Sequence, residues 1–294
     1  DHYNPLESIE KFRDSALTFP PGDHFEYSNS GYDLLAYMAE KITDSSYQNL
    51  LQKRIFDPVG MTNSGLDNHR EVIKNRASGY FKMWGTYANA NYVNMKRVYA
   101  AGGIYSTVED LFLWDRALAN HMLLNKQHSD LLFTPFIADP DYQGDYGYGW
   151  ELSKKRIGNT DKTVFVQHHD GVINGFCALI SRIPDTESSI IILSNKRSAP
   201  LNSITRGVLG ILLGETYDLP KKSVALETQM VITEKGIEAG ILYYKSNKKA
   251  PDFYLSEQEF IVVGYEYLQE YDAATAAQIF KLAIDAFPNA DNPY

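Results

Sequence analysis

Two short segments carry side chains that could move protons beside a substrate. The first, Tyr27-Ser28-Asn29, follows a proline-glycine turn, and the second, His169-Asp170-Gly171, precedes an apolar run. A tyrosine has an ordinary pKa of about 10, so it works as a base only if nearby cations lower that value. Imidazole titrates closer to neutral pH, and a glycine leaves room for a substrate to approach the backbone. Together these groups could serve a reaction that needs proton transfer beside an exposed strand.

Neither motif is specific by itself. Tyr-x-Asn also occurs at Tyr87 and Tyr92, whereas His-x-Gly occurs once, at His169. Taken alone, Tyr27 is more often a core tyrosine at a helix start, and His169 a strand histidine that bonds to backbone. His168 and His169 make a poor metal pair, because neighbouring side chains on a strand point to opposite faces. No His-Glu-x-x-His pattern or carboxylate cluster is present, so the sequence predicts no metal and no cofactor.

The order of several further segments strengthens both motifs. They are Phe56-Asp57-Pro58-Val59-Gly60-Met61, Ala101-Gly102-Gly103-Ile104-Tyr105-Ser106-Thr107-Val108-Glu109-Asp110-Leu111 and Tyr146-Gly147-Tyr148-Gly149-Trp150. In order and spacing, the chain from about residue 5 to residue 215 resembles the serine β-lactamase, penicillin-binding protein and serine esterase superfamily, in its class C-like branch. The Tyr27 and His169 segments match the second and third signature elements of that superfamily.

The resemblance implies acyl transfer through a seryl acyl-enzyme. Tyr27 would be the general base or proton relay, and Asn29 would hold the substrate amide and a lysine. His169 stands where relatives usually carry lysine, so it would orient the tyrosine and attract a substrate carboxylate. Imidazole is charged only below about pH 6.5, which favours an ester or D-amino-acid peptide over a β-lactam. Gly171 would admit the substrate, and the backbone N–H of Val172 would donate to the oxyanion, a contact whose loss typically costs about 10²–10³ in rate.

The first signature element, Ser-x-x-Lys, carries the nucleophile in the superfamily. Two formal matches occur, at Ser8-Ile9-Glu10-Lys11 and Ser246-Asn247-Lys248-Lys249. The first lies too close to Tyr27 and the second is polar throughout, so neither is expected to be the nucleophile. We expect that segment upstream of Asp1, and the chain as written to be inert. Two alternatives stay open: a non-catalytic module that keeps a penicillin-recognising cleft, and an interaction scaffold built on the C-terminal helices.

Composition narrows the class of protein. The chain has 294 residues, a formal net charge of -9 and 44% hydrophobic residues. An acidic balance argues against nucleic-acid binding, which usually needs a basic patch, and no apolar run is long enough to span a bilayer. The single cysteine, Cys177, excludes a disulfide within the chain and is expected to be a small buried hydrophobe. The resemblance implies a small-molecule or peptide ester or amide as substrate, and a periplasmic or secreted location in the bacterial envelope.

The pattern of the first 217 residues predicts an α+β fold, an antiparallel sheet flanked by helices. Helices are expected after a cap at Asn29 or Ser30, from about Tyr47 to the turn Asp57–Met61, after a capping box at Ser106–Glu109, and over Leu201–Leu213. Strands are expected at Val164–Val166, Phe176–Ile183 and Ser189–Leu193. Glu109 and Asp110 are interpreted as first-turn acids facing the helix dipole rather than as paired catalytic carboxylates.

A second region is predicted from residue 218 to residue 294, after a linker at Asp218–Lys222. It is helical throughout, with helices expected over Val231–Tyr244, Glu257–Glu270 and Ala273–Phe287. The last two resemble the first unit of a tetratricopeptide array, which needs about three repeats to bury its faces. We therefore expect a partial repeat that continues beyond Tyr294 and could dock a protein partner.

Overall fold

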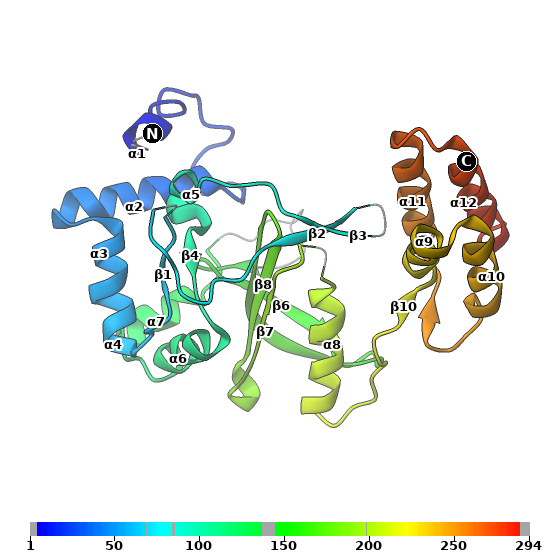
Figure 1. Cartoon of the computed structure of the whole chain (residues 1–294). Helices are drawn as coiled ribbons and strands as arrows, with labels where there is room; N and C mark the ends of the chain where they lie inside the picture. The colour runs from blue at the N-terminus through cyan, green and yellow to red at the C-terminus, as the bar shows by residue number, and fades with distance from the viewer. Residues whose placement is uncertain (1–4, 69, 84–85, 137–144, 198, 289–294) are drawn as a thin grey trace. The chain divides into compact units, whose positions relative to one another are not determined.

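The computed structural model describes residues 5–68, 70–83, 86–136, 145–197 and 199–288 (Figure 1). The backbone groups into two compact units, Asp1–Gly79 with Asn91–Tyr217, and Tyr80–Ala90 with Asp218–Tyr294. The sequence had suggested one continuous first domain over residues 1–217, whereas residues 80–90 group with the second unit. The domain division itself stays a prediction.

The first unit is built on a five-stranded antiparallel sheet in the order β5-β6-β7-β8-β9. The strands are β5 (Asp145–Tyr146), β6 (Glu151–Arg156), β7 (Thr163–Ile173), β8 (Phe176–Ile183) and β9 (Ser188–Ser194). This sheet, with helices around it, confirms the expected α+β class. β8 has the predicted bounds, but β7 runs seven residues beyond the predicted Val166. Polar residues occupy that extension, which hid its strand character from the apolar pattern.

The two faces of the sheet pack against different helices. On one face, Val166, Ile183 and Ile190 pack with Leu209 of α8 (Leu201–Leu212), the helix drawn along the sheet in Figure 1. On the other face, Leu152 and Ile180 pack with Leu118 of α6 (Val108–Ala119). Helix α7 (Lys126–Leu132) adds Leu132 to this second layer. Alternation along β7 therefore sends consecutive side chains into different layers.

The segment before Tyr47 forms α1 (Pro5–Ile9) and α2 (Asn29–Thr43). The start of α2 corrects the predicted cap, because Ser28, and neither Asn29 nor Ser30, accepts the capping hydrogen bond, from Gly31 N. Several large apolar side chains of α2 lie at the surface. Leu35, Met38 and Ile42 are 60%, 48% and 80% exposed.

A second group of helices follows from Tyr47. It comprises α3 (Tyr47–Leu51), a π-helical turn (Gln52–Phe56) and α4 (Asp57–Val59), which ends at Gly60 with φ 80° as the turn signal predicted. Leu51, Phe56 and Met61 form its small core. The next stretch contains β1 (Gly65–Leu66), paired with β4 (Ile104–Tyr105). It also contains a helix that the sequence did not predict, α5 (Met95–Gly102).

The N-cap of helix α6 lies one residue later than the predicted capping box placed it. Thr107, rather than Ser106, is its N-cap and accepts from Asp110 N. Asp110 is more than a first-turn acid, because its buried carboxylate also accepts hydrogen bonds from Asn63 N and Ser64 Oγ, both at 2.7 Å. The carboxylate thus ties the loop before β1 to the start of α6.

The second unit contains a hairpin of β2 (Tyr80–Met83) and β3 (Thr86–Asn89), and the parallel pair β10 (Lys222–Ser223) and β11 (Phe253–Tyr254). Its four helices are α9 (Val224–Lys235), α10 (Ile237–Asn247), α11 (Glu257–Gln269) and α12 (Ala273–Ala286). The predicted helix Val231–Tyr244 is wrong, because Gly236 adopts φ 84° and separates α9 from α10. The four helices share one buried core that includes Val224, Phe260 and Ile279.

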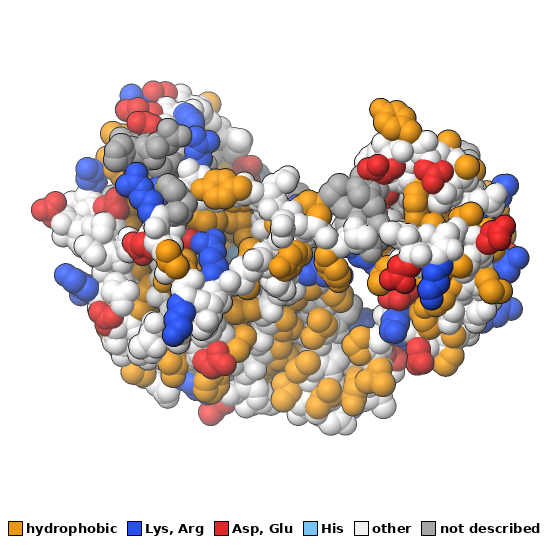
Figure 2. All heavy atoms as spheres, viewed as in Figure 1, with side chains coloured by type: hydrophobic (Ala, Val, Ile, Leu, Met, Phe, Trp, Pro, Cys, Tyr) orange, Lys and Arg blue, Asp and Glu red, His pale blue; other side chains and the backbone are white. Residues whose placement is uncertain are grey.

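Several remaining features bear on chemistry. Cys177 is buried, as predicted, and its Sγ donates to Lys196 O at 3.2 Å. Among the described residues, no helix combines the length and apolar composition that crossing a bilayer requires. In that same part of the chain, no three His, Cys, Asp or Glu side chains gather where they could hold a metal ion. Figure 2 shows hydrophobic side chains gathered over the region of α8, where Ile211 and Leu212 are 58% and 49% exposed.

Candidate active site

Tyr27 is held at the entrance to α2 by the capped turn that follows it. Ser28 Oγ accepts from Gly31 N at 3.0 Å, which satisfies one of the orphan amides of the first turn. The Tyr27 ring is 53% exposed, and its centroid lies 6.0 Å from that of His169, with the rings tilted by 37°. The structure thus brings together the two rings that the sequence singled out from positions far apart in the chain.

His169, Gly171 and Val172 lie on β7 where that strand loses one neighbour. In the described residues, the ladder with β6 ends at the pair Glu151–His168. From His169 onward β7 pairs with β8 alone, in the register that sets Gly171 opposite Ala178. In the described part of the chain no strand pairs with the other edge of β7 at these residues, an arrangement that an extended ligand would require.

Gly171 and Val172 pair with β8, but their side-chain positions face no tight packing. A Cβ added at Gly171 would meet the Ala178 Cβ at 3.9 Å, an ordinary contact. Packing within the chain therefore does not require glycine at this position. Val172 is 57% exposed. Their predicted roles in substrate approach and oxyanion binding stay predictions.

Tyr146 is a member of the cluster to which the sequence assigned no role. It ends β5, its hydroxyl lies 2.9 Å from His169 Nε2, and its ring packs against Phe25 at 4.7 Å between centroids. The segment Tyr146–Trp150 had been noted only as a stretch in the right order. Its pairing with His169 is a tertiary contact, which no local pattern encodes.

The hydrogen bonds of His169 define how the ring is used. Nδ1 lies 2.6 Å from the Asp170 carbonyl oxygen. Since a carbonyl only accepts, Nδ1 carries a proton and donates. In the neutral ring Nε2 is then an acceptor, and it accepts from the Tyr146 hydroxyl. His169 is therefore fixed in orientation by one backbone group and one phenol.

Electrostatics keep both phenols of the cluster protonated. Burial raises the pKa of Tyr27 above its ordinary value, and Tyr32, Asp170 and Glu151 raise it further. Burial, followed by Tyr32, also raises the pKa of Tyr146. A tyrosine base needs a neighbouring cation, and none of these influences on Tyr27 is cationic. The surroundings of Tyr27 in this structure therefore favour its neutral phenol.

His168 takes no part in this cluster. It is 6% exposed on the α8 face, where Nε2 lies 3.1 Å from Ser153 Oγ and 3.5 Å from Glu151 Oε2. Burial, with a smaller effect from Lys155, lowers the pKa of His168 to about 4. The opposite facing of the two histidines agrees with the argument against a metal pair.

Asn29 is placed near the cluster without joining it. It is the first residue of α2 and is exposed. In the described chain no hydrogen bond links Asn29 to Tyr27 or His169. The same holds for Ser8, in α1, and for Ser246, in α10. The roles of Asn29 in substrate and lysine binding therefore stay predictions.

Comparison with known protein families assigns this chain to one of them. The Beta-lactamase family matches residues 1–210. The chain belongs to the beta-lactamase family. The match ends before the C-terminal helices, so their resemblance to a tetratricopeptide unit stays a prediction.

Named relatives agree with this assignment. A penicillin-binding protein of Bacillus subtilis (strain 168) is 30% identical over 229 residues, which are 71% of this chain and 50% of that protein. The mitochondrial serine beta-lactamase-like protein of Homo sapiens is 28% identical over 234 residues, 68% of this chain and 43% of that protein. This beta-lactamase family chain thus spans about half the length of the curated relatives it matches.

Solved structures share the fold. An octameric penicillin-binding protein homologue from Pyrococcus abyssi has a TM-score of 0.63 at 25% identity, covering 79% of this chain and 52% of that one. A D-amino acid amidase from Ochrobactrum anthropi SV3 has a TM-score of 0.60 at 21% identity, covering 72% and 65%. A class C beta-lactamase has a TM-score of 0.58 at 21% identity, covering 72% and 64%. These likenesses support the fold of the family member described here.

Proposed function

We propose that this chain supplies the tyrosine-histidine half of a serine hydrolase site that cleaves an ester or amide. The observation that carries the proposal is the cluster of Tyr27, His169 and Tyr146 beside the open edge of β7. The names of the relatives, which include penicillin-binding proteins and a D-amino acid amidase, are consistent with acyl transfer. The location in a bacterial envelope remains part of this proposal.

In the proposed reaction, a serine oxygen forms a bond to the acyl carbon while the bond to the leaving alcohol or amine breaks. The serine proton passes through Tyr27 to the leaving group, and water later repeats the transfer in reverse. When protonated, His169 would attract a substrate carboxylate, and the Tyr146 oxygen would then accept from Nε2 and keep the ring in place. The open backbone at Gly171 and Val172 would receive the acyl oxygen.

The nucleophile and its lysine are proposed to come from a segment outside residues 1–294. The raised pKa of Tyr27 supports this, because the environment in the described residues favours the neutral phenol. A lysine ammonium beside the hydroxyl would act in the opposite direction and permit the phenolate. The same observation also favours the second candidate, a non-catalytic binding module, when no such cation is supplied.

The test is to join residues 1–294 at Asp1 to a Ser-x-x-Lys segment of the kind that carries the nucleophile in the superfamily. We expect the folded chimera to hydrolyse a p-nitrophenyl ester catalytically, while the chain alone does not exceed its heat-denatured control. Circular dichroism verifies folding of both. A folded but inactive chimera that still binds a penicillin would support the binding module instead. Catalysis by the chain alone would contradict an upstream nucleophile.

A further inference from the structure

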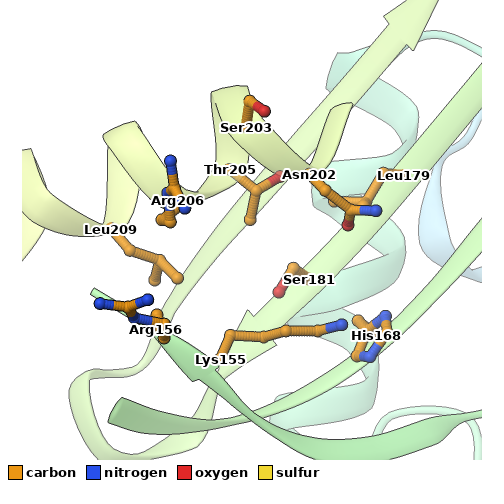
Figure 3. Close-up of a pocket in the computed structure, with 10 residues that line it drawn as sticks. All are labelled: Lys155, Arg156, His168, Leu179, Ser181, Asn202, Ser203, Thr205, Arg206 and Leu209. Atoms are coloured by element: carbon orange, nitrogen blue, oxygen red, sulfur yellow. The ribbon is translucent and has the colours of Figure 1, made fainter. Parts of the chain in front are cut away.

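A partly open cavity lies on the opposite face of the sheet from the Tyr27–His169 cluster. It has a volume of about 230 Å³ and lies between α8 and strands β6, β7 and β8 (Figure 3). A buried water needs only about 10–15 Å³ of such space, so the cavity can hold a small molecule with some solvent. All of its lining residues belong to the first unit.

Two hydroxyl groups in this cavity are buried without a partner. Ser181 is 1% exposed and Thr205 is 6% exposed, and neither Ser181 Oγ nor Thr205 Oγ1 has a hydrogen bond. Figure 3 shows Ser181 on the sheet and Thr205 on α8, on opposite sides of the same space. Buried hydroxyls are nearly always satisfied by protein, water or ligand. Their joint presence indicates that something polar occupies the space between them.

The charge around the cavity indicates the sign of that occupant. Lys155 and Arg206 line it, and in the described chain neither makes an ion pair. Arg156 also lines the cavity, but its guanidinium is already paired with Asp161 at 2.9 Å. No Asp or Glu belongs to the lining, and two acids contact lining residues, Asp161 at Arg156 and Glu151, 3.5 Å from His168. The balance at the cavity is therefore cationic.

The start of α8 adds to this positive character. Its N-cap, Pro200, provides no side-chain hydrogen bond to the first turn. Asn202 and Thr205, from the first turns of α8, line the cavity. Uncapped amides at a helix start carry partial positive charge and favour an anion. Here this effect supplements the two buried hydroxyls and the two unpaired cations.

We infer that this cavity binds a small oxyanion, the phosphate or carboxylate group of a small molecule. Lys155 and Arg206 supply the compensating charge, while Ser181 and Thr205 donate hydrogen bonds to its oxygens. His168 forms the neutral end wall. The site is independent of the proposed hydrolase site, because His168 and His169 project from β7 to opposite faces of the sheet.

The test is a titration of the ¹⁵N-labelled full chain, followed by NMR, with inorganic phosphate and, separately, with acetate at constant ionic strength. We expect the amide signals of Ser181 and Thr205 to shift and saturate with at least one anion. Saturation with phosphate alone would assign a tetrahedral oxyanion, and saturation with acetate alone a carboxylate. Shifts that sodium chloride reproduces, or that never saturate, would show that only water fills the cavity and would overturn the inference.

Variants assign the site to these residues. Lys155→Met should weaken anion binding about tenfold, since one charged hydrogen bond is lost. The matched control is Lys154→Met, because Lys154 is exposed, neighbours Lys155 on β6 and does not line the cavity. Equal affinity in both variants would contradict the inference.

A second variant distinguishes binding from folding. Thr205→Val keeps the side-chain shape but removes an unpartnered hydroxyl. We expect a weaker anion response together with an unchanged or raised Tm of the anion-free chain, because no satisfied hydrogen bond is lost. A lowered Tm with unchanged anion affinity would show that Thr205 is satisfied within the protein and would overturn its assigned role.

Discussion

His168 and His169 are neighbours on β7, but their surroundings differ in kind. His168 is buried under α8, and its pKa is lowered to about 4. His169 lies beside two phenols where the edge of β7 is open, bonded to Tyr146 and to its own backbone. The strand period of two produces this contrast. A single strand can therefore contribute one histidine to the core and the other to the proposed site.

The His169 face itself changes along β7. Two residues before His169, Gln167 accepts from Arg182, whose Nε lies 2.6 Å from the fully buried Asp115. At His169, the same face of β7 lies beside the rings of Tyr27 and Tyr146. We expect substitutions in the first stretch to lower stability and those in the second to lower activity.

The largest effect is expected at Tyr27. In the chimera with a Ser-x-x-Lys segment, Tyr27→Phe should lower ester hydrolysis by about 10²–10⁴, the range for loss of a general acid-base group. Tyr92→Phe is the matched control, because Tyr92 begins another Tyr-x-Asn sequence and is 75% exposed. Initial rates at saturating ester measure both. Equal rates in the two variants would remove Tyr27 from the reaction.

The buried charges should give the next largest effect. Asp115→Ala leaves Arg182 without its carboxylate and should lower the free energy of unfolding by about 3–5 kcal/mol. Asp130→Ala removes only the exposed pair with Lys126, which should cost about 0.3–0.5 kcal/mol. Urea unfolding compares the two. Similar decreases in the free energy of unfolding for the two variants would mean that the buried pair of Asp115 and Arg182 does not stabilise the fold as described.

His168 should make stability depend on pH. Its folded pKa of about 4 lies below the ordinary value of about 6.5, so the unfolded chain binds more protons between these values. The contribution of neutral His168 to the free energy of unfolding is fully present above about pH 6.5. It is lost as the pH drops towards 4, and the loss is roughly 3 kcal/mol at most.

The variant His168→Gln isolates this contribution. Urea unfolding at a series of pH values should show a smaller loss between about pH 6.5 and pH 4 than in the parent chain. Lys155, Glu151 and His169 remain in place in both proteins. An identical pH dependence would show that His168 is not the buried neutral group described.

The smallest effect is expected at Tyr146. Tyr146→Phe removes one hydrogen bond to His169 and should cost about 0.5–1.5 kcal/mol in stability. The His169 Nδ1 proton should persist, because the Asp170 carbonyl still accepts it. Side-chain ¹⁵N shifts report that tautomer. Loss of the Nδ1 proton in this variant would show that Tyr146, rather than the backbone, sets the ring.

The sequence predicted elements whose signals are local. The apolar run of β8 and the helical spacing of α8 needed no tertiary information. Strand β6, with one acidic and three basic residues, was missed because Leu152 is its one buried residue. The break at Gly236 was missed because isolated glycines also occur within helices.

The candidate site was predicted only in part for the same reason. Tyr27 and His169 could be found because each lies in a recognisable order of motifs. Tyr146 could not be given a role, because its contact with His169 joins β5 to β7 across the sheet. The raised pKa of Tyr27 was also beyond the sequence, since it depends on burial and on Asp170 and Glu151 in space.

The most direct test of the central claim is intact mass after treatment with a fluorophosphonate serine probe. The account predicts no adduct on residues 1–294 alone, and one adduct on the folded chimera, at the serine of Ser-x-x-Lys. An adduct that maps within residues 1–294, or a folded chimera that remains unlabelled, would contradict the claim that this chain supplies the tyrosine-histidine half of a serine hydrolase.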